Sequence, residues 1–283
     1  MARQDLVLEQ GNVLPASIET ARSPQVRTAS SAGLSVQRLI GWLFCIPFYE
    51  TIAFVLRFRG YRVIDHEGTR ARYREILAEA RRDGAPLIIC ANHLTFIDSC
   101  LMIWAFGSSF WYMRNFSAFS WNLPAGDFFK KKFAFRVIAY LGKCIFIHRD
   151  GDKEHKRAIL DHCEDLVARG EVLTFFPEGR RSRTGRFEAD RLTYGAGKLA
   201  ASLPGCRILC VYLRGHKQET YSNYPRANSS FKIQLELLDP HPTMAQLDGR
   251  EACAHITGLI GQSLVKMEKE HFRCLPQSPA SSS

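Results

Sequence analysis

The chain has 283 residues, enough for one α/β domain with a terminal appendage. Hydrophobic residues make up 46% of the sequence, which excludes a protein that is disordered throughout. The formal net charge of +10 favours an anionic partner, namely nucleic acid, a phosphate-bearing substrate or an acidic membrane surface, and composition alone does not choose among them.

The N-terminal segment is polar and rich in serine and alanine. We expect residues 1–35 to form a disordered tail, because they contain no apolar stretch of the kind that a secretory signal peptide requires. Asp5, Glu9 and Glu19 argue against an organelle transit peptide, which is poor in acidic residues.

Residues 39–58 form the most apolar stretch of the chain, with the sequence LIGWLFCIPFYETIAFVLRF. A membrane-spanning helix needs about 20 apolar residues, but Pro47 and Glu50 interrupt the middle of this stretch. We therefore predict two short helices, broken at Pro47, that dip into a membrane. The alternative is a buried helix that covers the domain. The expected membrane-associated helical segment occupies residues 36–66.

Beyond residue 60, helical and extended patterns alternate. Segments with helical spacing predict helices at residues 70–83, 97–106, 153–169, 194–203 and 243–270. Apolar runs predict strands at residues 86–92, 109–114, 144–149, 172–177, 207–213 and 231–238. This alternation indicates an α/β fold with a mixed, largely parallel sheet flanked by helices. We expect this domain at residues 67–272 and a disordered C-terminal tail at 273–283.

A basic and aromatic segment, residues 128–143, interrupts this pattern. It combines phenylalanine and tyrosine side chains with four cations, Lys130, Lys131, Lys132 and Arg136. Such a surface can lie on anionic lipid. An ordinary amphipathic helix with a solvated basic face is an equal alternative.

The nine cysteines are scattered along the chain without a C-x-x-C pair, and several, such as Cys90 and Cys144, lie in apolar runs. We expect reduced thiols that pack as small hydrophobic residues in a cytosolic setting. Their spacing does not match that of zinc ligands, so we expect no metal site.

The first chemical motif is ANHLTFIDS, residues 91–99, which follows an apolar strand. Ligands of α/β sheets bind at such strand ends. His93 and Asp98 are five residues apart, so a tight turn into a helix at Phe96 would let the carboxylate reach one imidazole nitrogen. The other nitrogen would then serve as a general base, activating a hydroxyl of the substrate itself. The alternative is structural, with Asp98 capping the helix that follows.

The second motif is FFPEGRRSRTGR, residues 175–186, which also follows a buried strand. Gly179 and Gly185 bracket the arginines at positions 180, 181 and 183, and Arg186 follows. Arginine makes planar, bidentate contacts with phosphate oxygens, and we expect Glu178 to hold one of the arginines in place. The alternative is a solvated basic loop, but the position at a strand end favours an anion site. A third strand end, in GKCIFIHR at 142–149, would add His148 and Arg149.

Together these blocks resemble the PlsC-like glycerolipid acyltransferases, a family that includes 1-acylglycerol-3-phosphate acyltransferases. NHLTFID fits the N-H-x-x-x-x-D signature of the family, GKCIFIHR resembles its second block, and FPEGRRS is similar to its third block, F-P-E-G-T-R-S. RILCVYLRG stands where the apolar fourth block belongs. The blocks follow the order of the family over residues 85–215.

The resemblance implies an α/β domain preceded by a membrane-binding helical element, with the active site on the cytoplasmic side of a membrane. His93 would remove the proton from the acceptor hydroxyl, and Asp98 would orient the histidine. The hydroxyl of a lysophospholipid, lysophosphatidic acid, would attack the thioester of acyl-CoA or acyl carrier protein and give phosphatidic acid for phospholipid biosynthesis. The resemblance implies no cofactor and no metal.

The resemblance also assigns acceptor-binding residues. Those that would bind or shape the site for the acceptor phosphate are Arg149, Glu178, Gly179, Arg180 and Arg181. Those expected to support them are Asn92, Ser182 and Arg183.

Departures from the family pattern leave the acceptor open. Arg180 stands where the family usually shows threonine, His148 where it shows aspartate or asparagine, and the fourth block carries Arg214 and lacks a proline. The continuation R-S-R-T-G-R also resembles glycerol-3-phosphate acyltransferases, so acylation of glycerol-3-phosphate or another lysolipid is the first alternative. The short chain favours the lysophosphatidate type.

Two alternatives belong to other classes. A catalytically silent lipid-binding relative is one, and the intact His93 and Asp98 speak against it. A nucleic-acid-binding protein is the other, but the arginines cluster in one loop and no nucleic-acid motif is visible, so we expect no nucleic-acid partner. A lipase-type hydrolase is disfavoured because no G-x-S-x-G elbow occurs.

Overall fold

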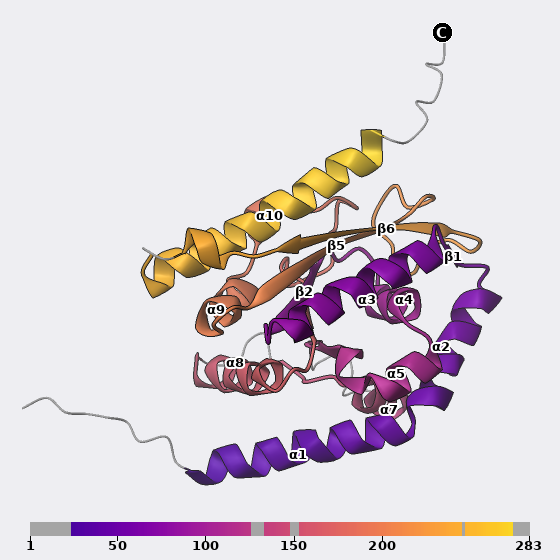
Figure 1. Ribbon diagram of the computed structural model, residues 1–283. Coiled ribbons are helices and arrows are strands. Elements are labelled where there is room, and N and C mark those ends of the chain that lie inside the picture. The colour runs from indigo at the N-terminus through magenta and orange to yellow at the C-terminus, as the bar shows by residue number, and fades with distance from the viewer. Residues whose placement is uncertain (1–23, 126–132, 148–152, 245–246, 274–283) are drawn as a thin grey trace, which may run out of the picture.

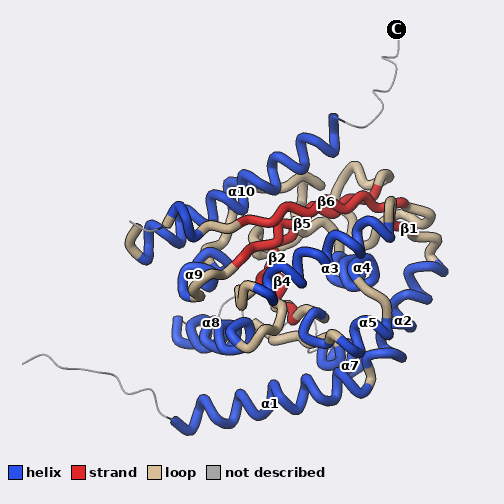
Figure 2. Tube along the Cα trace, viewed as in Figure 1, coloured by secondary structure: helices blue, strands red, loops and turns tan. Residues whose placement is uncertain are grey.

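The computed structural model describes residues 24–125, 133–147, 153–244 and 247–273, with the side chains of residues 24–31 excepted. The fold is built on a six-stranded sheet in the order β1-β6-β5-β2-β4-β3, drawn in red in Figure 2. The strands are β1 (Arg62–Val63), β2 (Leu87–Ala91), β3 (Trp121–Asn122), β4 (Leu173–Phe175), β5 (Arg207–Gly215) and β6 (Ser230–Leu238). Only the β5–β6 pair within this sheet is antiparallel. The predicted mixed, largely parallel sheet is confirmed.

Helices cover the sheet. They are α1 (Pro24–Leu43), α2 (Cys45–Phe58), α3 (His66–Arg82), α4 (Asp98–Phe106), α5 (Ser109–Arg114), α7 (Phe133–Leu141), α8 (Lys153–Ala168), α9 (Gly195–Ser202) and α10 (Gly249–Arg273). Short 3₁₀ turns occupy Phe116–Ala118, Ala189–Arg191 and His241–Thr243. The helices predicted from periodicity are confirmed within a few residues at most of their ends, as expected where capping and fraying blur the boundaries.

The two faces of the sheet bury separate hydrophobic cores. On one face, Leu87 and Ile89 of β2 pack in a cluster with side chains from α2, α3, α4 and α5. On the other face, Ile88 and Cys90 pack with side chains from α8, α9 and α10. Figure 1 shows α10 on one side of β5 and β6, with α3 and α4 across the sheet from it. Because successive strand residues point to opposite faces, burial on both faces explains the continuously apolar sequence of β2.

Two predicted strands are wrong. Residues 109–114 form the helix α5, whose N-cap Ser108 accepts a hydrogen bond from the backbone N–H of Trp111 at 3.4 Å. Tyr112 of this helix is buried and packs on Tyr49, with ring centroids 6.0 Å apart, so capping and packing outweigh the strand preference of aromatic residues. The segment predicted as a strand at 144–149 makes only isolated bridges in its described part, at Cys144 and Ile147.

The N-terminal helices differ from the prediction in two ways. First, α1 already begins at Pro24, so residues 24–35 are helical and not part of a disordered tail. Long-range contacts support this helix: the side-chain amide of Gln37 donates to the carbonyls of Tyr140 and Cys144. Second, the chain bends by 65° at Phe44 and not at Pro47. Pro47 lies in the first turn of α2, where its missing N–H has no helical partner to lose.

Among the described residues, no single helix has both the length and the hydropathy of a membrane span. The bent pair Ala32–Leu43 and Cys45–Phe58 reaches that length and hydropathy only when the two helices are taken together.

Candidate active site

The site begins where β2 leaves the sheet, and Asn92 shapes this exit. Its side-chain Oδ1 accepts a hydrogen bond from the backbone N–H of Leu213 at 2.7 Å, and its Nδ2 donates to the carbonyl of Leu213 at 3.1 Å. The buried amide thus pairs with the backbone of β5 in place of a further ladder step. The main chain is therefore free to turn outward at His93.

Asp98 closes the turn that follows, residues 92–98, hereafter the His93 turn. Its Oδ2 accepts hydrogen bonds from the backbone N–H groups of Leu94 at 2.7 Å and Thr95 at 2.8 Å, and lies 3.0 Å from Nδ1 of His93. The hydroxyl of Thr95 donates to the other carboxylate oxygen. The predicted reach of Asp98 to an imidazole nitrogen is confirmed. The alternative, that Asp98 caps the helix that follows, is not seen, because the N-cap of α4 is Ile97 and no side chain caps it. The carboxylate instead shapes the turn before the helix and contacts the ring.

The imidazole of His93 is held on two sides. Phe176 stacks against it with ring centroids 4.0 Å apart and an interplanar angle of 21°. A neutral ring that donates from Nδ1 to Asp98 carries its lone pair on Nε2. The side chain of His93 is 21% exposed while that of Asp98 is 4% exposed, so the histidine is reachable from solvent and its partner is not.

Glu178 joins the His93 turn to the motif that follows β4. Its Oε1 accepts a hydrogen bond from the backbone N–H of His93 at 3.0 Å, and its Oε2 accepts one from the backbone N–H of Glu188 at 3.3 Å. The N–H of Ser182 donates to the carbonyl of His93 at 2.9 Å. Burial raises the pKa of Glu178 to about 7, against the lowering effect of these hydrogen bonds. The Glu178 carboxylate therefore joins the backbone at His93 to the backbone at Glu188.

The arginine loop, residues 179–186, carries three kinds of arginine environment. Arg180 forms an ion pair with Glu188 at 3.1 Å. The expectation that Glu178 holds an arginine of this loop is therefore wrong, because Glu188 holds it. Arg181 donates to the side-chain oxygen of Asn223 at 2.6 Å and lies 6.0 Å from the ring of Phe96 in the His93 turn. Arg183 is exposed and lies over the ring of Tyr221. Of the three, Arg181 contacts the His93 turn directly.

Gly179 gives this loop its sharp start. Its φ of +65° lies in the left-handed region, and a Cβ atom there would meet Cγ2 of Thr193 at 2.9 Å. Both facts favour glycine at this position. Arg149, predicted to bind the same phosphate, lies outside the described residues.

Comparisons with known proteins identify the family of the chain. A family model described as acyltransferase matches residues 72–214, half of the chain. This chain belongs to the acyltransferase family. It is also similar to the N-acylphosphatidylethanolamine synthase of Arabidopsis thaliana, with 31% identity over 155 residues, which are 52% of this chain and 51% of the relative. The chain thus spans about half the length of this curated relative.

The structure of this acyltransferase adds residues that sequence reasoning missed. Asn223 and Tyr221 come from the loop between β5 and β6, residues 216–229, about 40 positions beyond the arginine loop in the sequence. The carbonyl of Asn223 accepts the backbone N–H of Phe96 at 2.9 Å. Phe176 is a third such residue. The sequence carries no motif for the two loop residues, whereas Phe176 stands directly before the P-E-G motif, which was a usable signal.

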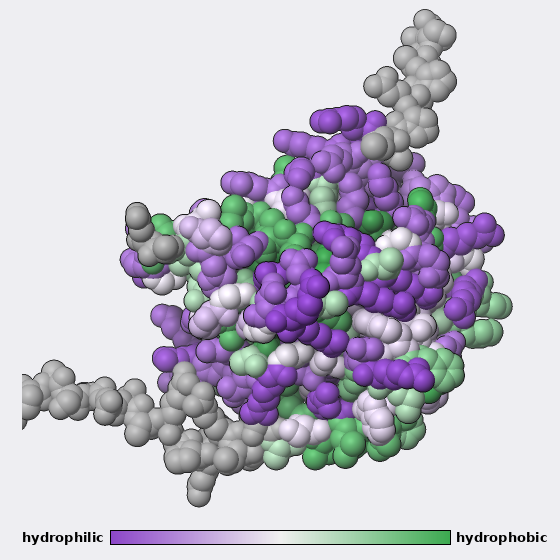
Figure 3. Space-filling model, in the orientation of Figure 1, coloured by the Kyte–Doolittle hydropathy of each residue, from purple (hydrophilic) through white to green (hydrophobic). Residues whose placement is uncertain are grey.

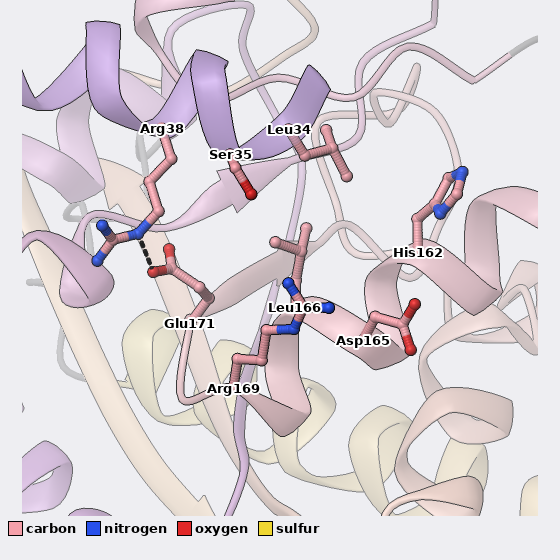
Figure 4. Close-up of a pocket in the computed structure, with 8 residues that line it drawn as sticks. All are labelled: Leu34, Ser35, Arg38, His162, Asp165, Leu166, Arg169 and Glu171. Atoms are coloured by element: carbon pink, nitrogen blue, oxygen red, sulfur yellow. Dashed lines mark hydrogen bonds and ion pairs between the residues drawn. The ribbon is translucent and has the colours of Figure 1, made fainter. Parts of the chain in front are cut away.

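A separate hollow of the acyltransferase, about 220 Å³ in volume, lies between α1 and α8 (Figure 4). Its lining consists of Leu34, Ser35, Arg38, His162, Asp165, Leu166, Arg169 and Glu171. Glu171 stands just before β4, whereas Glu178 follows that strand. The hollow therefore lies near the amino ends of the parallel strands, whereas His93 lies at their carboxyl ends.

Proposed function

We propose that this acyltransferase moves a fatty acyl group from acyl-CoA or acyl carrier protein to the free hydroxyl of 1-acylglycerol-3-phosphate, giving phosphatidic acid. The observation that carries the proposal is the placement of Arg181, a phosphate-binding type of side chain, against Phe96 within the turn that also holds the His93–Asp98 pair. A general base and an anion-binding group would then contact the two ends of one small glycerol phosphate unit.

The proposed reaction is a direct transfer. Nε2 of His93 takes the proton of the acceptor hydroxyl as its oxygen attacks the thioester carbonyl. The new C–O bond forms first, the C–S bond then breaks, and the departing thiolate receives the proton from the imidazolium. Asp98, held by backbone N–H groups, supports the cationic ring. No covalent acyl-enzyme is required, because the acceptor is itself the nucleophile.

The proposal is tested by acyl transfer from labelled long-chain acyl donors, with lysophosphatidic acid, glycerol-3-phosphate and phosphatidylethanolamine as parallel acceptors. Formation of labelled phosphatidic acid from lysophosphatidic acid supports the proposal. Transfer to glycerol-3-phosphate alone would replace the acceptor and keep the chemistry. Acyl-CoA and acyl carrier protein are compared as donors in the same assay.

A second candidate acceptor is the amine of phosphatidylethanolamine. The observation that favours it is the 31% identity to an N-acylphosphatidylethanolamine synthase. An N-acylated product in the assay above would establish this candidate. Against it stand the arginines beside the His93 turn, which repel an ammonium group and attract a phosphate.

Arg181→Ala is expected to raise the apparent KM for lysophosphatidic acid by about ten- to hundredfold with kcat changed little, because one charge-assisted contact to phosphate contributes on the order of 1.5–3 kcal/mol to binding. The measurement is initial rate against acceptor concentration. Arg82→Ala, an exposed arginine at the end of α3, is the matched control. An unchanged KM in the Arg181 variant would show that the arginine does not bind the acceptor.

We also propose that the acyltransferase lies on the cytoplasmic side of a membrane through the outer surface of its N-terminal helices. The supporting observation is a set of exposed large apolar side chains, visible as green areas along the lower edge in Figure 3. On α1, α2 and α7, and at the junction of the first two helices, these residues are Val36, Leu39, Leu43, Phe44, Phe54, Val55, Phe58 and Phe133. Burial of such side chains in the interface between headgroups and acyl chains is favourable. The free cysteines of the described residues fit a reducing compartment.

Phe54→Ser with Phe58→Ser is expected to weaken partitioning of the protein onto lipid vesicles at least tenfold. Phe54 is 66% exposed and Phe58 81% exposed, so the fold loses little while the membrane contact loses two aromatic anchors of roughly 1–2 kcal/mol each. Vesicle co-sedimentation is the measurement. Tyr194→Ser with Leu247→Ser, two exposed apolar residues outside the N-terminal helices, is the control. Equal partitioning of both double variants would place the contact elsewhere.

A further inference from the structure

Asn223 connects the His93 turn to the arginine loop through a single residue. Its backbone carbonyl accepts the N–H of Phe96 at 2.9 Å, and its side-chain oxygen accepts Nη1 of Arg181 at 2.6 Å. The hydroxyl of Tyr221 donates to the same side-chain oxygen at 3.0 Å. The position of Arg181 relative to the His93 turn therefore depends on the loop between β5 and β6.

The ring of Tyr221, in the same loop, contacts two arginine side chains. The guanidinium carbon of Arg183 lies 4.5 Å from the centre of its ring, and that of Arg181 lies 5.6 Å from it. Arg180, in contrast, forms an ion pair with Glu188. No carboxylate in the described part of the chain forms an ion pair with Arg181 or Arg183. An aromatic face and an amide oxygen hold these two cations without neutralising them.

Arg214 fastens the two loops together at their bases. It is 2% exposed, and its Nη1 donates to the carbonyl of Gly185 at 2.5 Å while its Nη2 donates to the carbonyl of Gln218 at 2.6 Å. Gly185 has a φ of +72°, and a Cβ atom there would meet the backbone of Thr220 at 2.9 Å. The end of the arginine loop and the start of the β5–β6 loop are thus packed backbone to backbone.

We propose that Asn223 is a positioning residue that sets acceptor selection, by holding Arg181 beside Arg183 and next to the His93 turn so that the pair binds a doubly charged phosphate monoester. This inference rests on the proposed function and adds how the enzyme selects its acceptor headgroup. Two cations without a carboxylate partner among the described residues match a dianion, whereas a zwitterionic headgroup brings an ammonium group into the same positive field. The hydrogen bonds named above supply the geometry.

The test compares kinetics with lysophosphatidic acid and with lysophosphatidylethanolamine, using the full chain. Asn223→Ala is expected to raise the KM for lysophosphatidic acid about tenfold, the loss expected for one charge-assisted hydrogen bond, with kcat within about twofold of the wild-type value. Its preference for lysophosphatidic acid falls by the same factor. Asn223→Asp is expected to raise that KM at least as much, because the new carboxylate pairs with Arg181 and competes with the phosphate.

A double-mutant cycle separates positioning from a general loss of structure. Added to Arg181→Ala, the Asn223→Ala change is expected to have little further effect on KM, because the residue acts through Arg181. Ser222→Ala, a neighbour in the same loop, is the control and is expected to keep wild-type kinetics. Thermal unfolding of each variant checks the fold.

Several outcomes would overturn the inference. These are an unchanged KM in Asn223→Ala, additive effects in the cycle, or a fall in kcat that is equal for both acceptors. Wild-type protein that does not acylate lysophosphatidic acid would instead remove the proposed function, and this inference with it. The two failures are distinguished by the wild-type assay alone.

Discussion

His93→Ala is expected to lower kcat for acyl transfer by about 10²–10⁴-fold, the range that a positioned general base contributes. The imidazole lies 3.0 Å from the buried Asp98 carboxylate and stacks on Phe176, so the geometry of the ring is set before an acceptor binds. Removal of the ring leaves the acceptor hydroxyl without a proton acceptor. Because the side chain is partly exposed and its backbone hydrogen bonds to Glu178 and Ser182 do not involve the ring, the fold is expected to survive.

Single-turnover acyl transfer is the measurement, with thermal unfolding as the check on the fold. His255→Ala is a suitable control, because that histidine lies on α10 and hydrogen-bonds only to Thr243 among the described residues. Asp98→Asn is expected to lower kcat as well, since it removes the carboxylate that selects the tautomer. A His93→Ala enzyme that kept more than a tenth of wild-type kcat would exclude this histidine as the base.

Lys143→Met is expected to lower the free energy of unfolding by about 3–5 kcal/mol, the loss observed when one partner of a buried ion pair is removed. The Lys143 side chain is 0% exposed and its Nζ donates to Glu171 at 2.5 Å and to the carbonyls of Phe116 and Phe119. Burial lowers the pKa of Lys143 to about 8, and the ion pair with Glu171 opposes that lowering. The variant would leave Glu171 with Arg38 and Trp121 as its remaining partners.

The pH dependence of the same pair has a definite sign. Burial acts to raise the pKa of Glu171, but Lys143 and its hydrogen bonds outweigh burial and hold that pKa below the ordinary 4.5. A carboxylate with a lowered pKa contributes stability that is present above pH 4.5 and is lost as the pH falls below that value. Urea unfolding at pH 7 and in acid measures both effects. Lys143→Met with Glu171→Leu is expected to recover part of the loss at pH 7, because no charge of the pair then remains buried. A loss below about 1 kcal/mol in Lys143→Met would contradict the assignment.

The elements whose burial follows a local rule were predictable from the sequence. The apolar run at 86–92 predicts β2, because a strand covered on both faces needs no polar alternation. The five-residue spacing of His93 and Asp98 predicts their contact, because a single turn closes it. The order of the blocks from residue 85 to residue 215 indicates the acyltransferase family, which the match over residues 72–214 confirms. The catalytic and phosphate-binding roles of these residues stay predictions.

What only the tertiary structure decided depends on contacts between distant segments. Residues 109–114 are a helix because Tyr112 packs on Tyr49. The helix α1 begins before residue 36, and its Gln37 side chain hydrogen-bonds to the carbonyls of Tyr140 and Cys144. The partner of Arg181 is Asn223, 42 residues away, and no local pattern marks it. The periodicity of the sequence predicts which face of an element is apolar, but it does not predict which polar groups hydrogen-bond between distant segments. Such pairs form only where the folded chain brings the acceptor within reach of the donor, and for a buried donor such as the Gln37 amide an unmade hydrogen bond also costs free energy.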